Sequence, residues 1–418
     1  MSSLQDELLP FEVDYDSDEE PPVAINFQEL RRRAGLAVSR TCTDIRLLTK
    51  GRYHEIFLLS FDNSDDPTSH NTPLGNGADS VKEWNCIARV SRQPECIKKL
   101  ISEMETMEYV RLHTSIPVPE VYSYDFDVRN SVSAQFMLME RKPGLHLYRI
   151  WDKLSLEHKK VAISEIARVQ AELSKLKFEE IGTLTSDGRI GPLIYCMGDE
   201  LKGLKTTSGG PFKSTLDYLL HFLNLRHDGT KDFEDVGLIL KSHLANLDNS
   251  PHVNSPFRLI HADLDGQNIL FTGGLPSSDS TDSVPPPRLS AVLDWEWAYT
   301  GPVHYLYKFP MCIRDCDDNV AAYSDNAILR PHFVRALRQF FPKESPGRIE
   351  VNASIKDDYM LNYYHFIFFT FAGAFDSETV KNFARLYVAN VHDGTKEGYY
   401  DRFDYSSDGD VPSDSEGL

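Results

Sequence analysis

The chain has few cysteines and no long apolar run, and these two shortages exclude several classes of protein. Its 6 cysteines in 418 residues do not form a disulfide framework, so we expect a reducing compartment and a cytoplasmic location. The longest apolar stretch, residues 360–375, contains polar side chains and is too short to span a bilayer, so no membrane partner is expected. The N-terminal segment lacks both a basic region and an apolar core, which argues against a signal peptide and a mitochondrial presequence.

Positive charge is also scarce. The chain has 44 Lys and Arg against 63 Asp and Glu, a net charge of −19. Residues 1–22 carry 8 acids without any Lys or Arg, and residues 400–418 carry 6 acids and one Arg. We therefore expect residues 1–24 and 400–418 to be solvated, disordered acidic arms on a mildly acidic body. Because no basic face is visible, nucleic acid is not an expected partner.

The order of apolar patterns divides the body near residue 144. Before that point the patterns predict a short helix ending at Gly35, three strands, a helix and two strands, which lie at residues 26–35, 44–51, 53–61, 84–92, 95–113, 120–126 and 134–140. After it the pattern is mostly helical with one β-rich interval, and the predicted helices are 156–176, 216–225, 233–247, 328–341 and 359–390. We predict an α+β fold with a small β-rich N-lobe (25–143) and a larger, mostly helical C-lobe (144–399).

The informative motif lies in the β-rich interval 259–297. His261-x-Asp263 is followed by Asn268 at the spacing H-x-D-x-x-x-x-N, and a later apolar strand ends in Asp294-Trp-Glu. Phosphoryl transfer from a nucleotide needs one carboxylate to orient or deprotonate the acceptor hydroxyl, and oxygen ligands to hold Mg²⁺ on the phosphates. Asp263 suits the first task, and Asn268 with Asp294 suits the second if a hairpin brings both oxygens to one metal. The alternative is a chance hydrogen-bonded hairpin.

Motifs for other chemistries are incomplete. Residues 198–206 resemble a Walker loop, but the lysine comes one residue late and no apolar strand precedes it. Cys312 and Cys316 could hold a metal, but without a second Cys or His pair at ligand spacing a helical neighbourhood is preferred. The chain has neither Gly-x-Ser-x-Gly nor His-Glu-x-x-His, so no hydrolase motif supports hydrolase chemistry.

These segments resemble the phosphotransferase motif of the aminoglycoside phosphotransferase family, relatives of choline kinase and more distantly of protein kinases. The similarity extends over roughly residues 35–390 and is most specific at 259–297. Residues 102–122 (SEMETMEYVRLHTSIPVPEVY) and 136–147 (FMLMERKPGLHL) look like the N-lobe helix and hinge of its fungal members. The resemblance implies a bilobed, protein-kinase-like fold, with ATP or GTP between the lobes near the hinge and Mg²⁺ as the metal.

The resemblance also assigns nucleotide-binding residues. Arg89 occupies the position of the family's nucleotide-binding lysine. Its ion-pair partner on the following helix is Glu103, and Glu105 is the alternative. Arginine can hold phosphate oxygens and a carboxylate together, but its planar fork is not interchangeable with an ammonium. The phosphate-covering loop has only Gly51 for close backbone approach, and Glu140 in the hinge belongs to the implied nucleotide site.

The acceptor is expected to be a small hydroxylated molecule. Trp and Glu follow Asp294 in place of Phe-Gly, no Ala-Pro-Glu segment follows, and Ala262 replaces the arginine of the protein-kinase loop. Without an activation segment there is no evident peptide-docking platform. The acids Asp315, Asp317 and Asp318 are conceivable acceptor contacts, with a solvated turn as the alternative.

The sequence therefore predicts an Mg²⁺-dependent small-molecule O-phosphotransferase that uses ATP or GTP. In this prediction Asp263 is the base in a catalytic loop opened by His261, and Asn268 and Asp294 bind the metal. The alternative is a kinase-fold protein that binds nucleotide as a sensor or scaffold, motivated by Arg89 and the single loop glycine. A protein kinase is a third, less favoured possibility.

Overall fold

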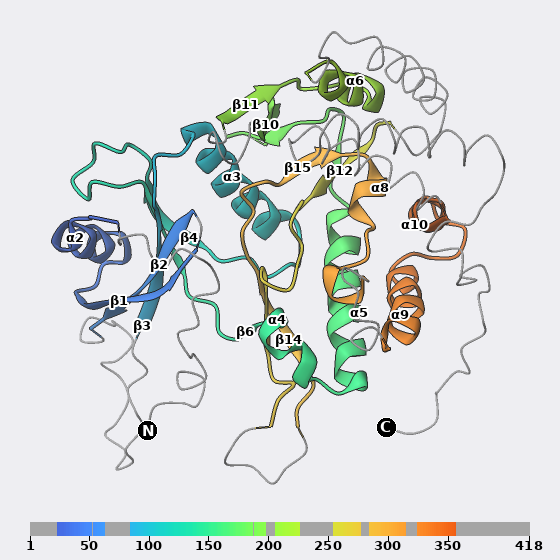
Figure 1. Ribbon diagram of the computed structural model, residues 1–418, viewed down its shortest axis with the longest axis horizontal. Coiled ribbons are helices and arrows are strands. Elements are labelled where there is room, and N and C mark those ends of the chain that lie inside the picture. The colour runs from blue at the N-terminus through green and yellow to red at the C-terminus, as the bar shows by residue number, and fades with distance from the viewer. Residues whose placement is uncertain are drawn as a thin grey trace. The chain divides into compact units, whose positions relative to one another are not determined.

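The computed structural model describes residues 23–51, 53–62, 84–186, 188–197, 205–225, 254–276, 284–314 and 324–356. These ranges contain helices and antiparallel sheets, which confirms the predicted α+β class (Figure 1). The chain divides into two compact units. The first comprises Met1–Lys153, Leu184–Arg189 and Gly266–Ala298, and the second comprises Leu154–Thr183, Ile190–Asp265 and Tyr299–Leu418. The division crosses the β-rich interval 259–297, because its residues up to Asp265 cluster with the second unit and those from Gly266 onward with the first.

The first unit is built on a five-stranded antiparallel sheet in the order β1-β2-β3-β5-β4. Its elements are α2 (Phe27–Val38), β1 (Cys42–Lys50), β2 (His54–Phe61), β3 (Trp84–Ser91), α3 (Ile97–His113), β4 (Val121–Asp125) and β5 (Phe136–Glu140). The predicted order of a short helix, three strands, a helix and two strands is confirmed. In the central register, Arg89 of β3 lies between Ile56 of β2 and Met137 of β5.

Alternation along β3 decides which side chains enter the core. Cys86, Ala88 and Val90 are fully buried in the apolar cluster that joins one face of the sheet to Leu30 and Ala34 of α2. Because successive side chains of a strand point to opposite faces, Arg89 must point away from this cluster. It faces α3, where its hydrogen-bond partner lies. The core thus rigidly holds the strand that carries the candidate nucleotide-binding cation.

The first helix ends later than predicted. Its N-cap is Asn26, whose side chain accepts a hydrogen bond from the backbone N–H of Glu29 at 3.1 Å. The helix passes through Gly35 and ends at Val38, with Ser39 in the left-handed conformation at φ 55°. Gly35 has a different role from the predicted stop, because a Cβ atom there would lie 2.7 Å from the carbonyl oxygen of Arg40. The glycine allows a close backbone approach, and the serine makes the turn.

A second sheet of the first unit carries part of the candidate site. It has the order β14-β13-β6 and is antiparallel throughout; its strands are β6 (Leu145–His146), β13 (Ile269–Thr272) and β14 (Arg288–Val292). Next to β6 in sequence are α4 (Leu147–Ile150) and the 3₁₀ helix η3 (Trp151–Lys153). Gly144, at φ 119°, could not carry a side chain because a Cβ atom would lie 2.6 Å from the carbonyl oxygen of Phe271. The change of pattern predicted near residue 144 therefore coincides with a close approach of the backbone to β13.

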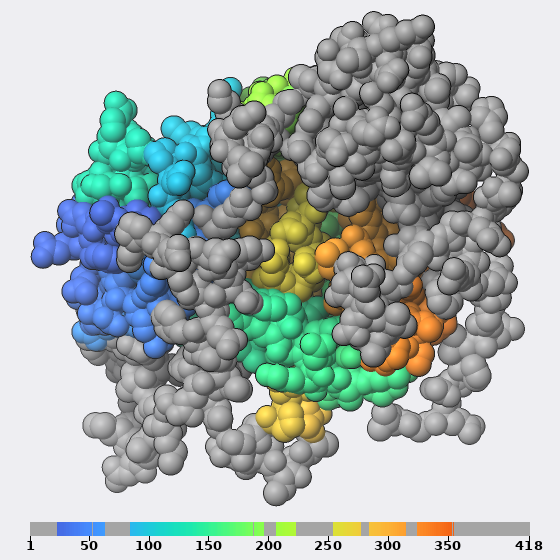
Figure 2. Space-filling model, in the orientation of Figure 1, coloured from blue at the N-terminus to red at the C-terminus, as the bar shows by residue number. Residues whose placement is uncertain are grey.

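The second unit is more helical. Its helices are α5 (Leu156–Leu173), α6 (Thr215–Leu225), α8 (Val303–Leu306), η4 (Met311–Ile313), α9 (Asn326–Gln339) and α10 (Pro346–Lys356), and its central sheet has the order β15-β12-β7, formed by Tyr299–Gly301, Phe257–Ile260 and Lys177–Phe178. Helices α5 and α9 pack along their apolar faces, and their surfaces adjoin on the face shown in Figure 2. Their predicted positions are confirmed to within a few residues.

The prediction of a single β-rich interval after residue 144 was wrong. Two hairpins lie before it: β8 (Thr183–Leu184) with β9 (Ile190–Gly191), and β10 (Leu193–Met197) with β11 (Lys205–Gly209). β8 and β9 have 2 residues each and β11 is polar, so three of the four strands gave no apolar signal, whereas the apolar run of β10 was a signal that the prediction missed.

Several predicted features lie outside the described residues. They are the two acidic arms, the Walker-like glycines, Cys316, the acids at 315, 317 and 318, and the helices predicted at 233–247 and 359–390. Within the described ranges, no helix combines the length and apolar character needed to cross a membrane.

Candidate active site

The predicted base lies in a tight turn after β12 in the second unit. His261 follows the strand directly and is 2% exposed, whereas the side chain of Asp263 is half-buried. Between them Ala262 has φ 68°, a left-handed conformation that a non-glycine residue adopts at some cost. The backbone carbonyl of Asp263 accepts a hydrogen bond from the N–H of Asp265 at 2.9 Å. This turn sets the backbone direction at Asp263, as a catalytic loop requires.

The two predicted metal ligands lie at one end of the β13–β14 hairpin in the first unit. Ile269 pairs with Val292, and the N–H of Leu293 donates to the carbonyl of Asn268 at 2.8 Å. Asn268 therefore immediately precedes one strand, and Asp294 follows the other at the same end. The hairpin predicted from the motif is present, and the role of its two oxygen-bearing side chains as metal ligands stays a prediction.

The backbone around Asp294 is strained and firmly held. Asp294 has φ 60°, and its side chain is 37% exposed. The next residue, Trp295, is fully buried, and its indole Nε1–H donates to the carbonyl of Val292 at 3.1 Å. The tryptophan anchors the turn, which leaves the carboxylate of Asp294 accessible beside a rigid strand end.

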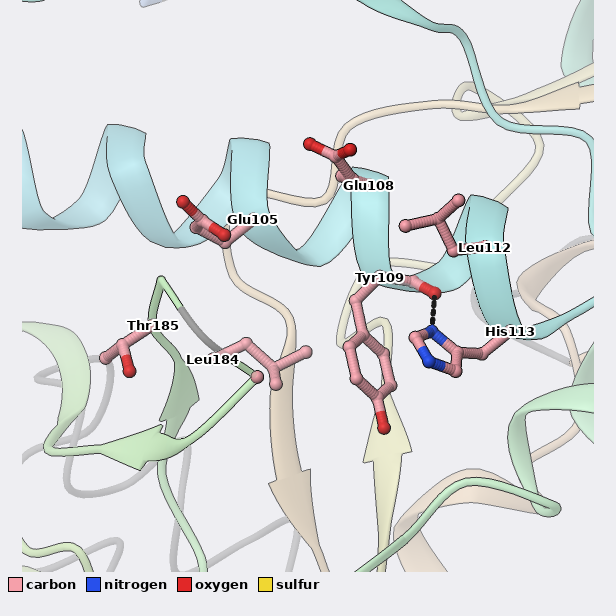
Figure 3. A pocket seen from close by; sticks show the side chains of 8 residues that line it. Glu105, Glu108, Tyr109, Leu112, His113, Leu184 and Thr185 are labelled. Carbon is pink, nitrogen blue, oxygen red and sulfur yellow. Dashed lines mark hydrogen bonds between the residues drawn. The ribbon is translucent and has the colours of Figure 1, made fainter.

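Arg89 and Glu103 form the predicted ion pair. The Arg89 side chain is 9% exposed and that of Glu103 is 2% exposed, and Nη1 of Arg89 donates to Oε2 of Glu103. The rival, Glu105, lies two residues further along α3 and therefore on a different side of the helix. Glu105 lines a surface pocket of about 330 Å³ together with Glu108, Tyr109 and residues of the segment 184–188 (Figure 3).

Arg89 also contacts groups that the sequence did not connect to it. Its Nη2 atom lies 3.0 Å from Oε2 of Glu296, 3.1 Å from Nδ1 of His54 and 3.5 Å from Oδ1 of Asp294. Burial alone would lower the pKa of Arg89, but the carboxylates of Glu103, Asp294 and Glu296 outweigh burial and raise it. The guanidinium is thus a permanent charge that lies directly beside the predicted metal ligand Asp294.

Lys99 extends this arrangement into a buried charge cluster. Its Nζ lies 2.6 Å from Oε2 of Glu95 and 2.8 Å from Oε2 of Glu296, and 4.6 Å from the ring centre of Trp297. We call this set the Arg89–Lys99 cluster; its members are His54, Arg89, Glu95, Lys99, Glu103 and Glu296. The signals for it in the sequence were the i,i+4 spacing of Glu95 and Lys99 and the acid that follows Asp294-Trp. Neither signal indicated that Glu296 would contact Lys99.

The charges within the Arg89–Lys99 cluster stabilise one another. Burial favours the neutral form of Lys99, but Glu296 and Glu95 raise its pKa. Burial would likewise raise the pKa of Glu95, yet His54 and Lys99 hold it below its ordinary value. The pKa of His54 is lowered, first by burial and then by Arg89. A neutral His54 can accept from Arg89 at Nδ1, and its Nε2 lies 2.7 Å from Oε1 of Glu95.

Part of this cluster has the spacing of a metal site. One ligand atom each from His54, Glu95 and Glu296 lies within 4.8 Å of the other two. The ammonium of Lys99, however, already contacts both carboxylates, so a bound cation would face like charge at close range. We infer that the ammonium group of Lys99 takes the place that a metal ion would have among these three side chains.

The remaining predicted nucleotide-binding residues lie at two turns of the N-terminal sheet. The N–H of Gly51 donates to the carbonyl of His54 at 2.7 Å, which closes the turn between β1 and β2. The carboxylate of Glu140, at the end of β5, pairs with Nζ of Lys142 at 2.7 Å. Its backbone N–H donates to the carbonyl of Glu120 at 2.8 Å. Both residues therefore have defined backbone positions, and their contact with nucleotide stays a prediction.

Comparison with known proteins identifies the family of these motifs. The family model described as the phosphotransferase enzyme family matches residues 74–305, more than half of the chain. A subtelomeric hrmA-associated cluster protein of Aspergillus fumigatus is 26% identical over 229 residues, which cover 50% of this chain and 40% of that protein. Altered inheritance of mitochondria protein 9, mitochondrial, of Candida tropicalis is 34% identical over 146 residues, 34% of this chain and 21% of that protein. The chain spans less than half of the length of these curated relatives.

Two solved structures with known ligands align over most of the chain. The streptomycin–ATP–APH(2″)-IIa ternary complex has a TM-score of 0.45 and 12% identity, over 83% of this chain and 94% of that chain. A ternary complex of a thermostable APH(4)-Ia mutant with AMP-PNP and hygromycin B has a TM-score of 0.40 and 16% identity, over 86% of this chain and 98% of that chain.

Proposed function

This chain belongs to the phosphotransferase enzyme family, and from that membership we propose that it moves the γ-phosphoryl group of ATP or GTP to a hydroxyl of a small molecule. The observation that supports this best is the 3.5 Å separation between Nη2 of Arg89 and Oδ1 of Asp294. It puts a permanent cation beside a carboxylate at the end of a strained hairpin. A phosphate–metal complex needs both kinds of group side by side.

The chemistry of the side chains fits Mg²⁺ and a nucleotide. Asp294 and Asn268 offer a carboxylate and an amide oxygen at the same hairpin end, and Mg²⁺ prefers oxygen ligands. Arg89 has five N–H donors in a planar fork, so one edge can hold Glu103 while others bind phosphate oxygens. When bound, Mg²⁺ would neutralise the charge that develops on the transferred group.

The other proposed roles follow from position in the fold. Asp263 takes the proton of the acceptor hydroxyl at a carboxylate oxygen, and the left-handed turn at Ala262 fixes its backbone. His261, buried at 2% exposure, anchors the end of β12. Glu103 holds Arg89 in place. We also propose a cytoplasmic location, supported by the free thiols of Cys42, Cys86, Cys96 and Cys312.

Thermal unfolding with nucleotide tests the binding half of the proposal. The wild type should melt at a higher temperature with Mg²⁺ and ATP or GTP, because a ligand at a hundred times its Kd stabilises by about 2.7 kcal/mol. The same nucleotide without Mg²⁺ should give a smaller shift. If neither nucleotide shifts the transition at millimolar concentration, the proposed function is wrong.

Transfer is tested by ADP or GDP release in the presence of a panel of small hydroxylated acceptors, including aminoglycosides, choline and reducing sugars. Asp263→Asn should keep the nucleotide-dependent thermal shift and abolish acceptor-stimulated release. Equal loss of binding and transfer would contradict the role of base. Nucleotide binding with no transfer to any acceptor would favour the scaffold alternative, and transfer to a generic protein substrate would favour a protein kinase.

A further inference from the structure

Both protons on the Nη2 atom of Arg89 are matched by acceptors already present. A terminal guanidinium nitrogen carries two N–H groups. Glu296 at 3.0 Å and His54 at 3.1 Å lie within hydrogen-bond distance of this nitrogen, and the carboxylate of Asp294 lies beside it at 3.5 Å. A phosphate oxygen that approached Asp294 through a metal would meet this same nitrogen. Any new acceptor at this nitrogen must therefore take an N–H from one already present.

Of the two carboxylates hydrogen-bonded to Arg89, Glu296 is the one that keeps another cation when its contact is lost. A single oxygen, Oε2 of Glu296, accepts from both Nη2 of Arg89 and Nζ of Lys99, at 3.0 and 2.8 Å. If Arg89 turned toward a phosphate, Glu296 would still have the Lys99 ammonium as its partner, so no buried carboxylate would be left without a cation. Glu103 differs in this respect, since Arg89 is the only partner that the described residues supply for its carboxylate.

We propose that Glu296 competes with the nucleotide phosphates for Arg89, and that Lys99 retains Glu296 when Arg89 turns to the phosphates. This inference rests on the proposed function, because it takes Arg89 as the phosphate-binding cation. Glu296 and Lys99 are positioning residues, which act on nucleotide through Arg89. Glu103 is the fixed anchor of the guanidinium, and Glu296 is its exchangeable partner.

The two carboxylates on Arg89 consequently have opposite effects on binding. Glu296→Gln keeps the shape and removes the charge, so the competing hydrogen bond becomes a neutral one of about half the strength. We expect the affinity for MgADP to rise about fivefold. Glu103→Gln makes the same chemical change on the same guanidinium but weakens its anchor, and we expect the affinity for MgADP to fall by a similar factor.

Isothermal titration calorimetry of the full chain with MgADP, and separately with adenosine, tests the inference. Adenosine lacks phosphates, so its affinity should be the same in wild type, Glu296→Gln and Glu103→Gln, whereas the affinity for MgADP should move in opposite directions in the two variants. Lys99→Met leaves Glu296 with Arg89 alone and should weaken MgADP binding. If Lys99→Met does not fold, the two glutamine variants decide the question by themselves.

Three results would overturn the inference. In the first, Glu296→Gln weakens MgADP binding as Glu103→Gln does, which shows that both acids merely hold Arg89 in place. In the second, Glu296→Gln leaves MgADP binding unchanged. In the third, the affinities for MgADP and adenosine change together, which shows a general disturbance of the unit. If the wild type binds no MgADP at all, the proposed function fails as well, so the two failures are distinguishable.

Discussion

Replacing Arg89 by methionine should destabilise the protein strongly, and the cause should be the orphaned carboxylate of Glu103. That carboxylate is 2% exposed, and Arg89 is its partner within the described residues. Removing one member of a buried ion pair costs about 3–5 kcal/mol because the remaining charge has neither water nor a counterion. Glu296 should contribute less to the loss, since it keeps Lys99 at 2.8 Å.

The double variant Arg89→Met/Glu103→Leu separates this cause from lost packing. Replacing both members of a buried pair by apolar side chains of similar volume is often neutral. We therefore expect the double variant to regain at least about half of the stability lost in Arg89→Met. The assay is urea denaturation followed by tryptophan fluorescence, with the four variants of the double-mutant cycle measured under identical conditions.

The control cycle uses Arg129 and Asp127, which form an ion pair with side chains 86% and 51% exposed. Exposed pairs contribute little, so Arg129→Met and Asp127→Leu should leave the denaturation midpoint almost unchanged, alone or together. If Arg89→Met and Glu103→Leu instead destabilise additively, the burial argument for this ion pair is refuted.

Three further substitutions test other parts of the structure. Asp294→Ala should abolish the Mg²⁺ dependence of nucleotide binding, which titration calorimetry with and without Mg²⁺ measures; an unchanged metal dependence would contradict the hairpin assignment. The pKa of His54 is lowered below its ordinary value of 6.5, first by burial and then by Arg89. The unfolded chain therefore binds this proton more readily, and stability is lost as pH falls through 6.5. His54→Gln should lose less melting temperature between pH 7 and pH 5.5 than wild type, and an equal loss would show that His54 does not contribute. Leu138→Ala, at a fully buried position of the sheet core, should cost about 2–5 kcal/mol in urea denaturation, and a loss under about 1 kcal/mol would mean that the core collapses around the gap.

The local features of the site followed from short-range rules. The strand ends at Asp263 and Asp294 were visible because apolar runs stop at a carboxylate, and the spacing to Asn268 pointed to phosphoryl transfer. The order of strands and helices before residue 144 also came from local periodicity, because each element there is long and clearly patterned.

Features that depend on long-range contact could not be read in this way. The contacts of Glu296 with Arg89 and Lys99 join residues 207 and 197 positions apart. The choice between Glu103 and Glu105 depended on how α3 is rotated about its axis against β3, because residues two apart on a helix face different directions. That rotation is set by packing across the whole sheet, which local periodicity does not contain.

The first helix shows the same division on a smaller scale. Glycine at position 35 is the usual signal for a helix end, yet the helix continues to Val38. Gly35 instead serves the turn that follows the helix, where the carbonyl oxygen of Arg40 comes within 2.7 Å of where a Cβ atom of residue 35 would lie. Composition and local pattern were sufficient to locate the chemical groups and the family. The partner of each buried charge was set by the packing of distant strands and helices, because a buried charge needs a counterion and only the tertiary structure decides which one is near.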